Sequence, residues 1–289
     1  MKDNNIDVIQ RAKELLLESP IMKYGITPER IEQVFTKVHM MTTQEELEKE
    51  YNPYKKYDGR LEGFNRNHHC YFGPEATPHV VIHEILHELS SEFDKDGHRT
   101  ENGIAKDNRY SQILLNEGMI DYLASKISGE EVSHYSREKF VIERLEAMLL
   151  KQSGNPDVLF QILLQEKNKI NEFIEDFAKP DTAKEMIDRF EFMDKEKINL
   201  AMNEIEKRFN RHHKFEQIKA RINSIFHRKK ALPPGISNPA TEQKDSAKIW
   251  RMKQHEVYKA YHSEMSNQQH TQEELNIVKP TIEDEEQSL

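Results

Sequence analysis

Two short stretches of the sequence carry residue types that could hold a metal ion. The first is HVVIHEILHELS at 79–90, where His83, Glu84 and His87 form an HExxH pattern inside an apolar run. Because an α-helix completes a turn in about 3.6 residues, His83 and His87 project from one face and can bind the same ion. Glu84 points about 100° around the helix, where it could take a proton from metal-bound water as a general base.

The second stretch, LLNEGMIDYL at 114–123, supplies the ligand that two histidines lack. Catalytic zinc usually has three protein ligands and keeps its fourth position for water, so a third donor must come from elsewhere in the chain. Glu117 fits that role. Glu117 and Asp121 are four residues apart on a second predicted helix, so one can bind the metal while the other accepts a histidine N–H.

Chance is the alternative explanation for a bare HExxH pattern. A chain with 14 histidines and many glutamates can produce these five residues by accident. The downstream NExxxD pattern lies on a separate predicted helix, and its residues fill roles that the first pattern leaves vacant. The joint occurrence therefore favours a genuine Zn²⁺ site.

Gly118 stands beside Glu117 in the interior of the second predicted helix. An interior glycine costs about 1 kcal/mol relative to alanine, so a packing reason is expected. The sequence predicts that Gly118 lets this helix approach the HExxH helix closely.

Taken together, these motifs resemble those of the gluzincins, the thermolysin-like clan of zinc metallopeptidases. The similarity covers roughly residues 63–127, with more residues between His87 and Glu117 than in thermolysin itself. It implies a zincin-like catalytic core that hydrolyses a peptide or protein substrate. The roles that it implies are metal ligands for His83, His87 and Glu117, general base for Glu84, and orientation of the two histidines for Asn116 and Asp121.

The resemblance also implies a tyrosine or histidine that donates a hydrogen bond to the oxyanion. The sequence offers His98, Tyr110, His134 and Tyr135 for this role. Tyr135 is preferred because it follows the Glu117 helix after a short turn at Ser128-Gly129. The alternative is that Tyr135 is an ordinary surface residue.

The composition limits the class of protein. With 36% hydrophobic and 32% charged residues, the 289-residue chain is too polar to be globular throughout, so part of it is expected to be a tail. Cys70 is the single cysteine, which excludes an internal disulfide framework and favours a reducing, cytoplasmic location. The N-terminus lacks the features of a signal peptide, and no stretch of about 20 apolar residues predicts a membrane span.

The predicted fold class is α+β and mainly α, with a small antiparallel-edged sheet in the catalytic core and a helical C-terminal lobe. A strand is expected over 63–72, with Phe64, Cys70 and Phe72 on one face. By resemblance, substrate would lie along this strand as an added antiparallel strand. The predicted parts are an N-terminal helical region at 1–58, the core at 59–136, a helical bundle lobe at 137–230 and a polar, disordered tail at 231–289.

The end of the predicted bundle is basic. Residues 207–230 hold nine Lys or Arg against one acid, Glu216. This stretch is either a solvated helix face or a site for an acidic partner, whereas the net charge of −9 disfavours nucleic-acid binding.

Two other function classes are consistent with the same motifs. One is a zinc-stabilised regulatory or interaction protein without catalysis. The other is a dedicated regulatory or toxin-like protease that acts on a single partner protein.

Overall fold

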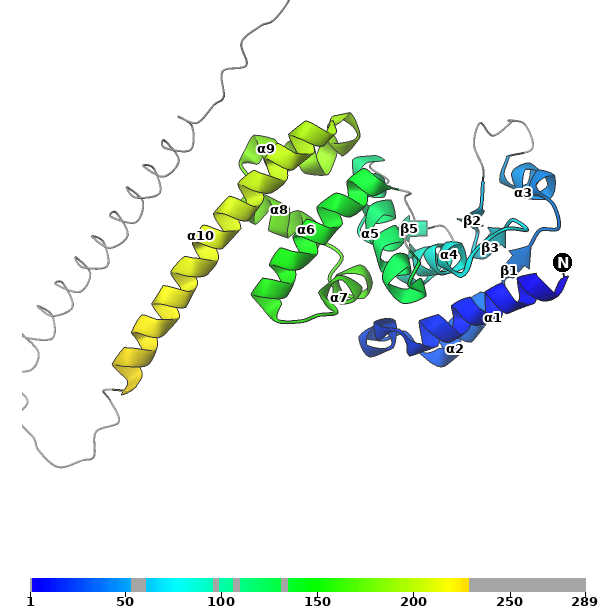
Figure 1. The fold of residues 1–289 in the computed structure, drawn as a ribbon, viewed down its shortest axis with the longest axis horizontal. Coiled ribbons are helices and arrows are strands. Elements are labelled where there is room, and N and C mark those ends of the chain that lie inside the picture. Colours follow the sequence, from blue (N-terminus) through cyan, green and yellow to red (C-terminus); the bar gives the residue numbers. More distant parts are fainter. Residues whose placement is uncertain (1, 53–60, 96–98, 106–109, 131–134, 229–289) are drawn as a thin grey trace, which may run out of the picture. The chain divides into compact units, whose positions relative to one another are not determined.

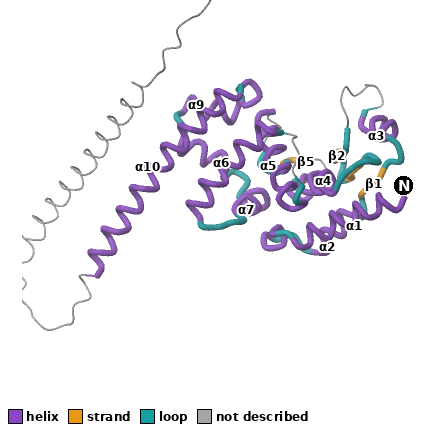
Figure 2. Tube along the Cα trace, in the orientation of Figure 1, coloured by secondary structure: helices purple, strands orange, loops and turns teal. Residues whose placement is uncertain are grey.

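A computed structural model describes residues 2–52, 61–95, 99–105, 110–130 and 135–228 of the chain. Residues 1–222 form one compact unit and 223–289 a second, of which only 223–228, the end of a helix, are described. The mainly helical α+β class is confirmed (Figure 1), and helices dominate the coloured trace in Figure 2. The predicted tail at 231–289 lies outside the described residues, and the four-part division stays a prediction.

The N-terminal part of the chain contributes short helices that pack on the centre of the unit. They are α1 (Lys2–Glu18), the 3₁₀ helix η1 (Pro20–Tyr24), α2 (Pro28–Phe35) and α3 (Gln44–Tyr51). Thr27 caps α2 as its side chain accepts a hydrogen bond from the Arg30 N–H, and Pro28 occupies the first helical position. Both α1 and α2 contact the HExxH helix, so residues before 59 support the site directly.

The segment 63–72 is a hairpin instead of the single strand that the sequence predicts. Strand β2 (Gly63–Arg66) pairs antiparallel with β3 (His69–Phe72), and the two turn residues between them have positive φ, 52° at Asn67 and 64° at His68. Two-residue hairpin turns require such φ values, and asparagine tolerates them well. Phe64 therefore faces away from Cys70 and Phe72 and stacks on Tyr71, with 4.8 Å between ring centroids.

A third strand determines which edges of the sheet are unpaired. Strand β1 (Val38–Met40) pairs in parallel with β3, so the strand order is β1-β3-β2. Strand β3, which directly precedes the HExxH helix, is thus the central strand and has both edges paired. An added substrate strand on β3 is excluded, and the antiparallel edge strand of the sheet is β2.

The HExxH helix, α4 (Pro78–Ser90), lies at the centre of the compact unit. Thr77 precedes its first turn and Pro78 occupies the first helical position, and the helix packs against α1, α2, α5, α7 and the strands β2 and β3. Its end is closed by hydroxyl groups, because Ser90 donates to the Leu86 carbonyl and Ser91 to the His87 carbonyl. Apolar side chains cover it on nearly every side, so its polar residues need partners within the protein.

The segment after α4 contains a small hairpin. Strands β4 (Glu92–Phe93) and β5 (Arg99–Glu101) pair antiparallel, and the backbone groups of Asn102 and Ala105 then pair with each other in a tight turn. Helix α5 (Tyr110–Ser128) follows and packs against both α4 and α6.

The C-terminal part of the compact unit is wholly helical where it is described. Its elements are α6 (Ser136–Ser153), α7 (Val158–Leu164), α8 (Lys169–Phe177), α9 (Pro180–Asp188), the 3₁₀ helix η2 (Phe190–Phe192) and α10 (Lys195–Arg228). One buried apolar cluster joins this part to α1 and α4. On α10 the last buried apolar residue in the described ranges is Phe209, and Phe215 and Ile218 are exposed.

No helix within the described ranges combines the length and the apolar character needed to cross a membrane.

Candidate metal centre

Helices α4 and α5 bring the three predicted ligands together. The Nε2 atoms of His83 and His87 lie 3.1 Å apart, and the Oε2 atom of Glu117 is 3.2 Å from the first and 3.1 Å from the second. Both histidines are buried, and the Glu117 side chain is 18% exposed. The i, i+4 spacing of the two histidines aligns them on α4, whereas Glu117 arrives from a helix thirty residues further along the chain.

The size of this triangle fits a metal ion. Nitrogen and oxygen ligands at about 2.0–2.2 Å from a tetrahedral zinc ion lie about 3.3–3.6 Å from one another. The three donor-to-donor distances of 3.1–3.2 Å are slightly below the lower end of that range. Two imidazoles and one carboxylate are also the donor types that zinc prefers, so the residues fit Zn²⁺ in both size and chemistry.

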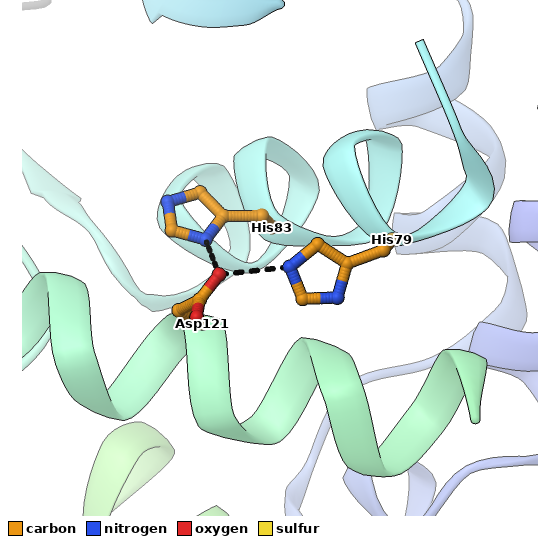
Figure 3. A group of neighbouring side chains, drawn as sticks. All are labelled: His79, His83 and Asp121. Atoms are coloured by element: carbon orange, nitrogen blue, oxygen red, sulfur yellow. Dashed lines mark hydrogen bonds and ion pairs between the residues drawn. The ribbon is translucent and has the colours of Figure 1, made fainter. Parts of the chain in front are cut away.

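Asp121 lies one turn after Glu117 on α5 and contacts the other side of His83. Its Oδ1 atom is 3.7 Å from His83 Nδ1 and 2.8 Å from the Nε2 atom of a further buried histidine, His79 (Figure 3). Because a carboxylate can only accept, His79 donates its Nε2–H to Asp121. The predicted neighbour of His83 is therefore present, with an additional partner that the sequence reasoning did not include.

The partner of His87 is Asn102, which was not among the predicted site residues. Its Oδ1 atom is 3.1 Å from His87 Nδ1, so the Nδ1–H of His87 is donated and the Nε2 atom is left for a metal. The sequence holds one signal that could have identified it. Asn102-Gly103 is a dipeptide typical of tight turns, and Gly103 has φ 56°.

Asn116, which was predicted to orient a histidine, contacts the turn that carries Asn102. Asn116 is fully buried, and its Oδ1 atom accepts a hydrogen bond from the Ile104 N–H at 3.0 Å. A Cβ atom on Gly103 would lie 2.1 Å from Asn116 Oδ1, so only glycine fits at this approach. No described contact joins Asn116 to His83 or His87, and its position links it to the site through the 102–105 turn.

Charge in the cluster favours a cation. Burial by itself lowers the pKa of His83, but the carboxylates of Asp121 and Glu117 raise it to about 10. Burial raises the pKa of Glu117, but the imidazoles of His87 and His83 lower it by more. The pKa of this carboxyl group is therefore well below its usual range. The same balance, through His79 and His83, lowers the pKa of Asp121. Two carboxylates in a buried pocket thus stabilise positive charge between them.

Glu84 is partly exposed on α4, between the two candidate ligands. Burial raises the pKa of its carboxyl group above the usual range, and the charges of His83 and His87 offset part of that effect. The side chain is therefore close enough to the imidazoles to respond to their charge.

Tyr135 lies beside the cluster. Its ring is nearly parallel to that of His83, with 6.1 Å between centroids and 10° between ring planes. The residue has φ 52°, an uncommon value for tyrosine, and is 37% exposed. Of the other candidates for this role, His98 and His134 lie outside the described residues, and the side chain of Tyr110 is likewise not described.

Close packing explains why residue 118 is a glycine, but the helix packed against it is not the predicted HExxH helix. A Cβ atom at this position would lie 2.3 Å from Glu138 Cβ and 2.9 Å from the Glu138 backbone carbon. Glu138 belongs to α6, so the glycine permits close approach of α5 to α6 and not to α4.

No protein-family model matches the sequence, and no curated protein or solved structure is significantly similar to it. The resemblance to gluzincins thus depends on the HExxH and NExxxD residues and on the buried His/Glu/Asp group that they form.

Proposed function

We propose that this protein is a zinc-dependent metallopeptidase in which His83, His87 and Glu117 hold the ion. The observation that carries the proposal is the convergence of two imidazole nitrogens and one carboxylate oxygen within 3.2 Å of one another, from two separate helices. A buried group of this kind needs a cation or a proton at its centre to offset its charge. Three protein donors leave one tetrahedral position for water, which is the arrangement of catalytic rather than structural zinc.

In this proposal the ion supplies Lewis-acid polarisation of the scissile carbonyl and lowers the pKa of the attacking water. Glu84 accepts the proton of that water and then delivers it to the leaving amine. The position of Glu84 beside His83 on α4, with its side chain partly exposed, supports this role. Partial exposure of Glu84 and Glu117 leaves both carboxyl groups in contact with water.

Tyr135 is the proposed hydrogen-bond donor to the oxyanion. Its ring stacks nearly parallel to that of His83, and we propose that its hydroxyl group donates to a negative oxygen that forms near that histidine. The left-handed backbone conformation of Tyr135 supports a functional constraint, since strained conformations cluster at active sites.

The test is the substitution Glu84→Gln in the full chain. This change keeps the size of the side chain and removes its ability to accept a proton, so zinc content should stay at one ion per chain. Peptide hydrolysis should fall by about 10²–10⁴-fold. Cleavage sites in a peptide library are compared by mass spectrometry for the wild type, Glu84→Gln and the control Glu143→Gln, which makes the same change at an exposed position on α6.

Each outcome separates the function classes. Full hydrolysis by Glu84→Gln would refute the assignment of the base. Zinc binding without cleavage of any peptide by the wild type would favour a zinc-stabilised interaction protein. Cleavage confined to one partner protein would identify a dedicated protease, and the basic stretch of α10 is then a proposed contact for an acidic partner.

A further inference from the structure

Three histidines on α4 alternate with two carboxylates on α5. His79, His83 and His87 follow one another at intervals of four residues, as do Glu117 and Asp121. Each carboxylate lies between two imidazoles: Glu117 between His83 and His87, and Asp121 between His79 and His83. The metal centre proposed above uses only His83, Glu117 and His87, so it gives His79 no role.

The residues at the start of this series, His79 and Asp121, are more deeply buried than Glu117. His79 and Asp121 are each 1% exposed, whereas the Glu117 side chain is 18% exposed. The distance of 2.8 Å between His79 Nε2 and Asp121 Oδ1 is that of a hydrogen bond (Figure 3). It is shorter than the roughly 3.3–3.6 Å expected for two ligands of one tetrahedral zinc ion. The geometry thus favours a hydrogen-bonded pair over a second set of metal ligands.

The two oxygens of the Asp121 carboxylate have different neighbours, a hydrogen-bonded histidine at Oδ1 and an ion-paired lysine at Oδ2. His79 contacts Oδ1, and the Lys139 Nζ atom lies 3.4 Å from Oδ2. The Nδ1 atom of His79 has no hydrogen-bond partner in the described part of the chain, so the contact with Asp121 is the polar interaction that its ring makes there. This buried imidazole is directed at one atom, and that atom also faces His83 Nδ1.

We propose that His79 is a positioning residue of the metal centre: it fixes Asp121 against His83 Nδ1 and so keeps His83 Nε2 directed toward His87 and Glu117. The proposal rests on the proposed function, because it assigns the ion to the outer group of donors. Metal-ligating histidines commonly donate their second N–H to a carboxylate that is itself hydrogen-bonded, and loss of such partners weakens metal binding about 10–100-fold.

The experiment measures zinc affinity of the full chain by competition with a chromogenic chelator. His79→Leu removes the donor and should weaken zinc binding about tenfold. His79→Gln can place an amide N–H near the position of Nε2 and should stay within about threefold of the wild type. His79→Asn is too short to reach Asp121 and should resemble His79→Leu, so the Gln and Asn variants decide the matter if the leucine variant does not fold.

A matched control is available at a second histidine–carboxylate pair, which joins the β2–β3 turn to α4. His68 Nδ1 lies 2.8 Å from the Glu88 carboxylate, which is as buried as Asp121, but this pair makes no contact with His83. His68→Leu should therefore leave zinc affinity within about threefold of the wild type. In ¹⁵N-histidine spectra of the zinc-loaded protein, exchange of the His83 Nδ1 proton with water should be faster in His79→Leu than in the wild type or His68→Leu.

Unchanged zinc affinity and proton exchange in His79→Leu, with zinc still bound by the wild type, would overturn the positioning role alone. A second ion in the wild type that disappears in His79→Leu would overturn it as well, because His79 would then be a ligand. Failure of the wild type to bind zinc would overturn both this inference and the proposed function.

Discussion

Both candidate histidine ligands have a polar partner on the ring nitrogen that faces away from the other donors. His83 has Asp121 near its Nδ1 atom, and His87 has Asn102 on its Nδ1 atom. Such partners fix the ring orientation and the tautomer, so the free Nε2 atoms point at Glu117. The two partners come from different parts of the chain, one from α5 and one from the turn after β5.

The contact between His87 and Asn102 can be tested at the level of the single residue. Asn102→Leu removes the acceptor and should weaken zinc binding about 10–100-fold. Asn102→Asp keeps an acceptor at the same position and should bind zinc at least as tightly as the wild type. Competition with a chelator measures both affinities, and equal values for the leucine and aspartate variants would contradict the role of Asn102.

At the scale of elements, Glu88 connects α4 to the segments around it. This carboxylate is 2% exposed, and it accepts hydrogen bonds from Asn65 on β2 and from His68 in the hairpin turn. Arg30 of α2 and Arg99 of β5 each lie 3.9 Å from it. Glu88 thus connects α4 to α2, to the β2–β3 hairpin and to β5.

Glu88→Ala should lower the free energy of unfolding by about 3 kcal/mol, at the low end for a broken buried ion pair, because its partners retain some access to water. The matched control is Glu50→Ala, which breaks the 2.6 Å pair between Glu50 and Arg66. Both side chains of that pair are more than 40% exposed, so the expected cost is below about 1 kcal/mol. Urea unfolding measures both variants, and similar losses would show that Glu88 is not a structural hub.

At the scale of the whole molecule, one buried apolar cluster contains residues of α4 and α5 together with residues of the N-terminal and C-terminal helices. The buried cluster includes Ala12 of α1, Ile85 of α4 and Phe209 of α10. The N-terminal helices and the C-terminal helical part are therefore packed on the same core that holds α4 and α5 in place. Beyond Phe209 the described side chains of α10 are increasingly exposed, and the compact unit ends at Ile222.

A chain that ends at Ile222 should keep the fold and the metal centre. We expect its midpoint of thermal unfolding to stay within about 3 °C of the full chain, because it retains every buried core residue of the described ranges, the last of which is Phe209. Zinc affinity should be unchanged, which the same chelator competition can measure. A chain that ends at Leu200 is the contrasting variant, because it loses Met202, Ile205 and Phe209 from the core and should unfold.

The sequence by itself determined the local features of this protein. The spacing of His83 and His87 places both on one helix face, and Thr77-Pro78 marks the start of that helix, because helix periodicity and capping depend on neighbouring residues. The donor types also follow from the sequence. Three of the predicted site residues, His83, His87 and Glu117, are indeed brought together.

Only the tertiary structure decided which distant groups meet. The positive φ values of Asn67 and His68 turn one predicted strand into a hairpin, and the paired strand β1 closes the edge on which substrate was expected. Gly118 faces Glu138 instead of α4, Asn102 takes the place expected for Asn116, and His79 joins Asp121. These contacts join residues far apart in the chain, and their partners depend on how helices pack and turns close, which local periodicity does not encode.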